Sequence, residues 1–266
     1  MKHRTFGRSG IKVSEIVFGA GAVGGVIIHK DDATKREAIR RALAGGINWI
    51  DTAAQYGNGK SEEALGWLLP AAGANPYLST KFGLDVENLK DVPAQIEKSL
   101  LASLARLKRS SVDLLQLHNR IGSKPGGRVM TVEQILDKNG VADGLERLRE
   151  KGLIRHMGIT AIGETASVCE VIRSKRFDSA QVYYNLLNPS AGRSMPLRSE
   201  RSPTGNVSAT AGCRRTRPEY ASSTAHAMCI PGRARARSVT AGMWCTTSPS
   251  DESFTKRTRC AGMAAF

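Results

Sequence analysis

Four side chains that can hold or transfer a proton follow predicted strands in the first half of the chain. Asp51 ends a short apolar run, and the phenol of Tyr56 lies in the glycine-rich loop that comes next. Lys81 and His118 directly follow two later runs of the same kind. Since the carboxyl ends of parallel strands meet at one edge of a sheet or barrel, we expect these four groups to share one rim. An acid, a phenol, an amine and an imidazole placed together are suited to acid–base chemistry.

The elements that must position these groups alternate regularly along the first 192 residues. Apolar runs of strand length alternate with segments whose apolar residues recur at helical spacing. Strands are predicted at 16–18, 47–50, 77–80, 112–117, 154–159 and 180–183, and helices at 34–44, 62–69, 93–107, 141–150 and 165–174. This order predicts an α/β fold with a parallel sheet. Polar groups at successive strand ends favour a (β/α)8 barrel of the TIM type, of which about six βα units are present.

Three shorter signals complete this picture. A hairpin is predicted around residues 7–10, and Thr131 with Gln134 predicts a capping box at the start of a further helix. The glycine-rich loop at 19–25 follows the first strand, where backbone can approach a phosphate. Its spacing is not that of a dinucleotide fingerprint, so a doubly wound cofactor domain is disfavoured.

Residues 1 to about 192 resemble the aldo-keto reductase family through five motifs in order. The motifs are Asn48–Ala53 with Tyr56–Gly57 and Ser61–Glu62; Ser79–Lys81; Asp113–His118; Lys151–Arg155 with Gly158–Thr160; and Gln181–Asn185. The resemblance implies NADP(H)-dependent reduction of a small aldehyde or ketone to an alcohol, or the reverse reaction. The four catalytic positions of the family match Asp51, Tyr56, Lys81 and His118.

The resemblance also implies a role for each of these four residues. Tyr56 exchanges a proton with the substrate oxygen, and His118 donates a hydrogen bond to that oxygen. A free phenol has a pKa of about 10, so a neighbouring ammonium at Lys81 is expected to lower the pKa of Tyr56. Asp51 is expected to pair with Lys81 and to hold its charge in place.

Cofactor-binding positions are also implied by the resemblance. Thr160 and Gln181 correspond to polar groups that bind the nicotinamide amide, and Gly21 corresponds to a backbone contact near the cofactor ribose. The Asn that the family often has beside the first of these positions is Ala161 here. The family also uses its seventh strand to stack an aromatic ring on the nicotinamide and its eighth to bind the 2′-phosphate. Neither has a recognisable counterpart after Gly192.

The segment 193–266 has a different composition. It contains eleven Arg and one Lys, ten Ser and nine Thr, but one Leu and one Ile. Such a segment can hardly bury enough apolar surface to offset its ordering entropy, so we expect an irregular or disordered tail. We interpret it as translated out of the original reading frame. The alternative is a genuine basic arm that binds nucleic acid.

Charge, hydropathy and cysteine usage limit the remaining function classes. The net charge of +15 divides into 27 Lys and Arg against 20 Asp and Glu in residues 1–192, and 12 against 4 in the tail. Nucleic acid is therefore not the expected partner of the first 192 residues. No apolar stretch is long enough to span a membrane and no signal-peptide segment follows Met1, which predicts a cytoplasmic protein. The four cysteines of the tail lack the close pairs of zinc sites, so no metal site is expected.

The sequence thus predicts an NADP(H)-dependent oxidoreductase of the aldo-keto reductase type, impaired because the C-terminal barrel units are lost. One alternative is a fully active reductase whose barrel is completed by the tail. Another is a non-catalytic protein that binds NADPH, or that uses its basic tail on nucleic acid. The substrate and the oligomeric state stay open.

Overall fold

The parallel sheet predicted from the sequence is present. The computed structural model describes residues 1–7, 9–21, 25–185, 226–229, 242–245 and 260–263. Six parallel strands occur at the predicted places. They are β3 (Phe18–Gly19), β4 (Trp49–Asp51), β5 (Tyr77–Phe82), β6 (Val112–Leu117), β9 (Ile154–Thr160) and β10 (Ser179–Tyr183). Neighbours along the chain are also neighbours in the sheet, whose order is β10-β9-β6-β5-β4-β3.

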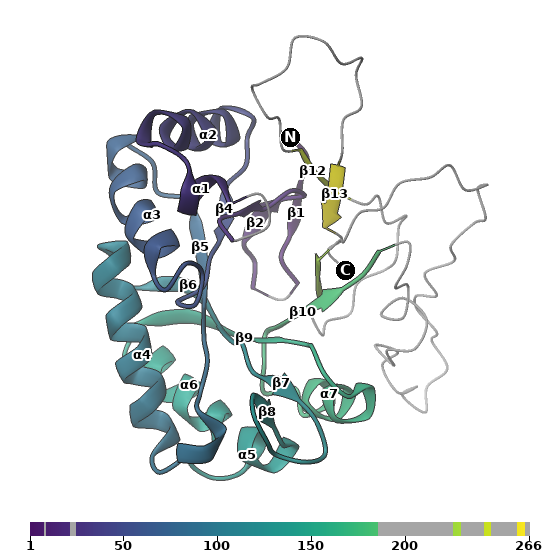
Figure 1. Ribbon diagram of the computed structural model, residues 1–266. Helices are drawn as coiled ribbons and strands as arrows, with labels where there is room; N and C mark the ends of the chain where they lie inside the picture. Colours follow the sequence, from purple (N-terminus) through teal and green to yellow (C-terminus); the bar gives the residue numbers. More distant parts are fainter. Residues whose placement is uncertain (8, 22–24, 186–225, 230–241, 246–259, 264–266) are drawn as a thin grey trace, which may run out of the picture.

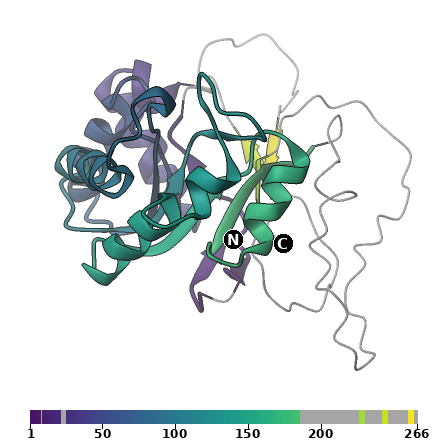
Figure 2. The same ribbon diagram turned by 90° about the horizontal axis from the view of Figure 1, so that it is seen from below.

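Helices follow the strands and cover the outer face of the curved sheet. In Figure 1, α2, α3, α4 and α6 form a layer on the left of the strands, and Figure 2 shows this layer from below. The helices are α1 (Val26–His29), α2 (Asp32–Ala44), α3 (Lys60–Ala71), α4 (Val92–Leu107), α5 (Val132–Leu136), α6 (Val141–Glu150) and α7 (Thr165–Arg173), with a 3-10 turn, η1, at Val86–Asn88. The fold is therefore of the (β/α)8 barrel type, and its described part contains six of the parallel strands.

Side-chain caps fix where several helices begin. The Asp31 carboxylate accepts a hydrogen bond from the backbone N–H of Thr34 at the start of α2, and Asp91 does the same for α4. Thr131 and Gln134 form the capping box predicted for α5. Each cap satisfies backbone donors that have no partner within the helix.

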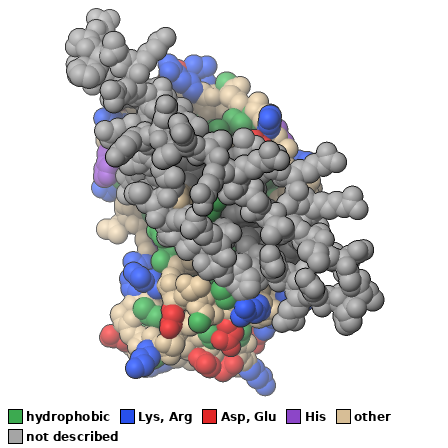
Figure 3. All heavy atoms as spheres, turned by 90° about the vertical axis from the view of Figure 1, so that its right-hand side faces the viewer, with side chains coloured by type: hydrophobic (Ala, Val, Ile, Leu, Met, Phe, Trp, Pro, Cys, Tyr) green, Lys and Arg blue, Asp and Glu red, His purple; other side chains and the backbone are tan. Residues whose placement is uncertain are grey.

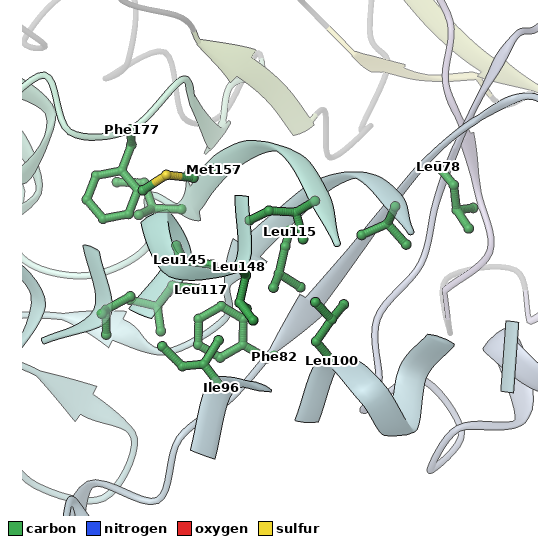
Figure 4. Close-up of a cluster of buried hydrophobic side chains, with 14 of the residues drawn as sticks. Leu78, Phe82, Ile96, Leu100, Leu115, Leu117, Leu145, Leu148, Met157 and Phe177 are labelled. Atoms are coloured by element: carbon green, nitrogen blue, oxygen red, sulfur yellow. The ribbon is translucent and has the colours of Figure 1, made fainter. Parts of the chain in front are cut away.

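The main core fills the space between the sheet and the helices. Figure 4 shows Leu115 and Leu117 of β6 and Phe82 of β5 pointing toward Ile96 and Leu100 of α4. A second cluster lies on the other face of the sheet, where Phe6, Val13, Val17, Trp49 and Leu114 pack together. Since successive side chains of a strand point to opposite faces, residues in step with Trp49 and Leu114 face the barrel interior.

A hairpin at the N-terminus contributes to this second cluster. It consists of β1 (His3–Thr5) and β2 (Lys12–Ser14), which pair antiparallel as predicted. Its link to the sheet is polar as well as apolar, because Asn48 accepts from the backbone N–H of Ser14 and donates to the carbonyl of Lys12.

Five short strands were not predicted. Strands β7 (Arg120–Ile121) and β8 (Val129–Met130) pair in parallel just after His118. The other three are β11 (His226–Cys229), which pairs antiparallel with β10, and β12 (Gly242–Cys245), which pairs with β13 (Cys260–Met263). These three lie in the segment after residue 192, where no strand was predicted because the stretches that form them contain no β-branched residues. The rest of that tail lies outside the described residues.

Among the described helices, none is both long and apolar enough to cross a lipid bilayer.

Candidate active site

An ion pair between Asp51 and Lys81 lies at the centre of the candidate site. Asp51 is the last residue of β4 and Lys81 lies near the end of β5, and the two strands are direct neighbours. Lys81 Nζ is 2.5 Å from Asp51 Oδ2 and donates to the carbonyl of Thr52 at 2.8 Å. The Lys81 side chain is 1% exposed, so the ammonium depends on these partners in place of water. Removing one member of such a buried pair leaves an uncompensated charge.

Tyr56 extends this pair toward the rim. Its hydroxyl lies 3.2 Å from Lys81 Nζ, and the ammonium also lies 4.9 Å from the centre of the phenol ring. The loop that carries Tyr56 requires glycine, because Gly57 and Gly59 adopt φ angles of +61° and +90°. A proton-bearing phenol is thus fixed beside a positive charge.

His118 completes the predicted group. Its ring lies edge-on to the Tyr56 ring, with the ring centres 5.9 Å apart. Its backbone N–H donates to the carbonyl of Phe82, which sets the turn out of β6. Nδ1 of His118 is buried and has no hydrogen-bond partner among the described residues. Burial and the charge of Lys81 lower the pKa of His118 to about 4, so the imidazole is neutral at neutral pH.

The electrostatics of Tyr56 differ from the sequence-based expectation. Burial raises the pKa of Tyr56, and this effect outweighs the lowering by Lys81. The expected net lowering of the phenol pKa is therefore wrong, because the sequence could not show how much water the ring loses. Burial lowers the pKa of Lys81, but its interactions with the Asp51 carboxylate and with the Tyr56 hydroxyl outweigh that effect and raise it. The resting site therefore holds a neutral phenol beside a charged ammonium.

Of the three predicted cofactor positions, Thr160 ends β9, Gln181 is the middle residue of β10, and Gly21 lies two residues after β3. Thr160 and Gln181 are register partners on β9 and β10, and both are buried. Thr160 Oγ1 donates to the carbonyl of Leu117 at 2.8 Å, which leaves its oxygen as an acceptor. A Cβ at Gly21 would lie 3.1 Å from Cε2 of Tyr56, so glycine here leaves space for the Tyr56 ring. The structure thus places Gly21 against Tyr56, and its ribose contact stays a prediction.

Ser79 is a member of the site that the sequence reading missed. Its hydroxyl donates to Asp51 Oδ1 at 2.6 Å and accepts from Nε1 of Trp49 at 3.0 Å. The sequence could have predicted this position, since Ser79 and Lys81 are two residues apart on β5 and their side chains therefore point to the same face of the strand. Gln116 of β6 is the register partner of Lys81 and lies on the same face of the sheet. Its side-chain amide nitrogen and oxygen are both buried without a hydrogen-bond partner among the described residues.

Glu62 makes contacts beyond those expected from its position in the sequence. Its place in the first turn of α3 fits the positive end of the helix dipole. In the structure it is fully buried, accepts from Thr80 Oγ1 at 2.5 Å, and pairs with Arg106 of α4 at 2.7 Å. Glu62 therefore joins β5, α3 and α4 behind the active site. Within the described residues no group of three or more His, Cys, Asp or Glu is placed to hold a metal ion.

Comparisons with known proteins agree with this geometry. Residues 15–196 match the model of the Aldo/keto reductase family. L-galactose dehydrogenase of Arabidopsis thaliana is 33% identical over 165 residues, which cover 60% of this chain and 48% of that protein. The solved glycerol dehydrogenase of Gluconobacter oxydans is 27% identical with a TM-score of 0.53, covering 69% of this chain and 55% of that one.

A structure of a Klebsiella pneumoniae aldo-keto reductase in complex with NADPH has a TM-score of 0.57 at 21% identity, and covers 73% of this chain and 63% of that one. At that identity it shows the common fold. The chain spans about half the length of curated relatives such as L-galactose dehydrogenase. The family model nevertheless covers the six parallel strands, and the chain belongs to the Aldo/keto reductase family.

Proposed function

We propose that the chain is an NADP(H)-dependent oxidoreductase that interconverts small aldehydes or ketones and the corresponding alcohols. The observation that carries this proposal is the continuous contact from Asp51 through Lys81 to Tyr56, with His118 edge-on to the phenol. These groups are arranged to give one proton to an oxygen at the rim and to stabilise the charge that this transfer leaves behind.

Tyr56 is the proton donor in the reducing direction. Its raised pKa keeps the phenol protonated at neutral pH, so a proton is available when negative charge develops on the substrate oxygen. After transfer, the phenolate lies 3.2 Å from the ammonium of Lys81, which stabilises it until solvent returns a proton. Asp51 keeps that ammonium in place and charged.

His118 orients the substrate. With a pKa of about 4 it stays neutral, and a neutral imidazole carries one N–H donor. A hydrogen bond from that N–H to the carbonyl oxygen would place the oxygen beside the hydroxyl of Tyr56. Because His118 is neutral, it polarises the carbonyl without competing as a proton donor.

The strand ends fit a nicotinamide cofactor. When bound, NADP(H) supplies or accepts the hydride at the carbonyl carbon. Gln181 and Thr160 would hold its carboxamide, since an amide and a free acceptor oxygen are register partners on adjacent strands. The NADPH complex of the Klebsiella pneumoniae protein of the same fold supports this cofactor class. We also propose that activity is reduced, because no counterpart of the family's seventh and eighth strand contacts can be recognised after Gly192.

The nucleic-acid alternative depends on the basic tail, most of which lies outside the described residues. On the described surface visible in the lower part of Figure 3, acidic and basic side chains are interspersed. That pattern does not favour a phosphate backbone, which requires clustered positive charge. We include a cytoplasmic location in the proposed function.

The test is turnover of 4-nitrobenzaldehyde with NADPH, followed by loss of NADPH and by formation of the alcohol. Tyr56→Phe is expected to lower kcat by about 10²–10⁴-fold, because the proton donor is lost, while NADPH affinity is unchanged. Tyr77→Phe is the matched control, since it removes the same hydroxyl from a tyrosine that packs beside Trp49 in the second apolar cluster. Equal turnover by wild type and Tyr56→Phe would remove the proposed role of Tyr56.

A further inference from the structure

Arg128 is a cation at the rim of the site that the proposed chemistry does not use. It lies just before β8, in the segment 119–132, which contains three basic residues and no Asp or Glu. The side chain of Arg128 is exposed, and among the described residues it forms no ion pair with a carboxylate. A guanidinium without an acidic partner is free to bind an anion.

Hydrogen bonds hold Arg128 next to both reacting side chains. Its Nη2 donates at 2.5 Å to Oε1 of Gln55, the residue directly before Tyr56. Its backbone carbonyl accepts hydrogen bonds from the backbone N–H of Arg120 at 3.0 Å and from the side-chain amide of Asn119 at 3.4 Å. Asn119 and Arg120 are the two residues that follow His118 in the chain. Arg128 therefore links the loop that carries the phenol, through its guanidinium, to the turn that carries the imidazole, through its backbone.

The amide of Gln55 that holds Arg128 lies against Gly83. A Cβ at Gly83 would lie 2.4 Å from Nε2 of Gln55 and 3.7 Å from Nη2 of Arg128. Gly83 directly follows β5, two residues after Lys81, so the bridge lies over the carboxyl end of the strand that carries the catalytic ammonium. The charge of Arg128 also reaches the site, since it contributes to the lowered pKa of His118.

We propose that Arg128 binds a carboxylate on the substrate, and that the preferred substrates are carbonyl compounds bearing such a group. This inference rests on the proposed reductase function and deepens it by naming the substrate class. Gln55 is the positioning residue, because its amide oxygen fixes one edge of the guanidinium and leaves the other donors for the ligand. The planar, multiply donating guanidinium suits bidentate binding of a carboxylate.

The experiment compares 4-carboxybenzaldehyde with its neutral isostere 4-carbamoylbenzaldehyde, using the full chain and NADPH. Wild type is expected to prefer the carboxylate in kcat/KM. Arg128→Met is expected to lower kcat/KM for the carboxylate by about 10- to 100-fold and to change the amide by less than about 2-fold. Arg128→Lys should restore part of the loss, and Gln55→Ala should cost about 2- to 5-fold on the carboxylate alone.

Arg120→Met is the matched control, because Arg120 is exposed on the neighbouring strand β7 and its substitution removes the same charge. An equal loss in Arg120→Met and Arg128→Met would assign the effect to net charge and overturn the proposal. So would a wild type without preference for the carboxylate, or a raised KM for NADPH in Arg128→Met, which would place the cofactor there.

A second readout separates this proposal from the reductase function. Calorimetric titration of the NADPH-bound chain with benzoate and with benzamide measures carboxylate binding without turnover. If neither aldehyde is reduced, the proposed function fails, whereas preferential binding of benzoate that is lost in Arg128→Met still supports the anion site. Equal binding of benzoate by wild type and Arg128→Met would overturn it.

Discussion

His118 shows how burial sets both chemistry and stability at a single residue. Its pKa is about 4 in the folded chain, against an ordinary value of 6.5. Between these two pH values the unfolded chain binds a proton that the folded chain does not bind. Lowering the pH through this window therefore favours unfolding.

We expect His118 to account for a loss of about 2 kcal/mol in the free energy of unfolding between about pH 8 and about pH 5. Urea denaturation of wild type and His118→Gln at both pH values measures it. The variant should show a shallower dependence, because Gln does not titrate. Identical dependence in the two proteins would mean that the imidazole is not buried as described. His156 beside Asp178 gives a control, since His156→Gln leaves the active-site ring in place.

The grouping of the four candidate side chains at one rim could be predicted because each lies within a short motif at or near the end of one strand. The partners that tune them could not. Gln55 and Arg128 are 73 residues apart, and Glu62 and Arg106 are 44 residues apart, so no local pattern links either pair. The direction of the Tyr56 pKa shift could not be predicted from the sequence either. It depends on whether the loss of solvent around the ring raises the pKa more than the charge of Lys81 lowers it.

At the scale of elements, close contact between helices depends on single glycines. Gly66 lies in α3, and a Cβ there would be 2.1 Å from the carbonyl oxygen of Arg106 in α4. Glycine inside a helix normally destabilises it by about 1 kcal/mol relative to Ala. Here its missing side chain lets two backbones meet and allows Arg106 to reach the buried Glu62.

Gly66→Ala is therefore expected to destabilise the fold by about 2 kcal/mol or more, although helix propensity alone predicts stabilisation. Thermal and urea denaturation measure the change. Lys98→Ala, on the exposed face of α4, is the control and should stay within about 0.5 kcal/mol of wild type. A Gly66→Ala protein as stable as wild type would contradict the close approach of α3 and α4.

The elements themselves were largely predictable. All six parallel strands and the hairpin were expected, since apolar runs bounded by Gly, Pro or polar residues are strong local signals. Strands β7 and β8 have two residues each, too few to show any period. Their pairing depends on the loop that also places Arg128, so no local pattern predicted that part of the rim.

At the scale of the whole molecule, folding and cofactor binding are linked. A ligand that binds only the folded chain, at 100 times its dissociation constant, adds about 2.7 kcal/mol to stability. We expect NADPH to raise the midpoint of thermal unfolding and ATP, as an anion control, to leave it unchanged. An equal response to both anions would mean that the strand ends do not form a nicotinamide site.

The division of the chain at residue 192 is our proposal for its domain organisation: a barrel portion before it and an Arg-rich tail after it. If the tail is out of frame, the coding sequence contains another frame that encodes a Leu-rich continuation with alternating strands and helices. Absence of such a frame would favour a genuine basic arm, whose binding to duplex DNA would weaken steeply with salt.

The path of hydrogen bonds from Trp49 to the active site gives the molecule an internal optical reporter. The indole is buried between Phe6 and Tyr77, and its N–H reaches Asp51 through the hydroxyl of Ser79. Undocking of the N-terminal hairpin would let water reach the ring and shift its emission to the red. A change in the charge of Asp51 would alter the emission without that shift. The fluorescence of Trp49 can therefore follow both docking of the hairpin and the charge state of the Asp51–Lys81 pair.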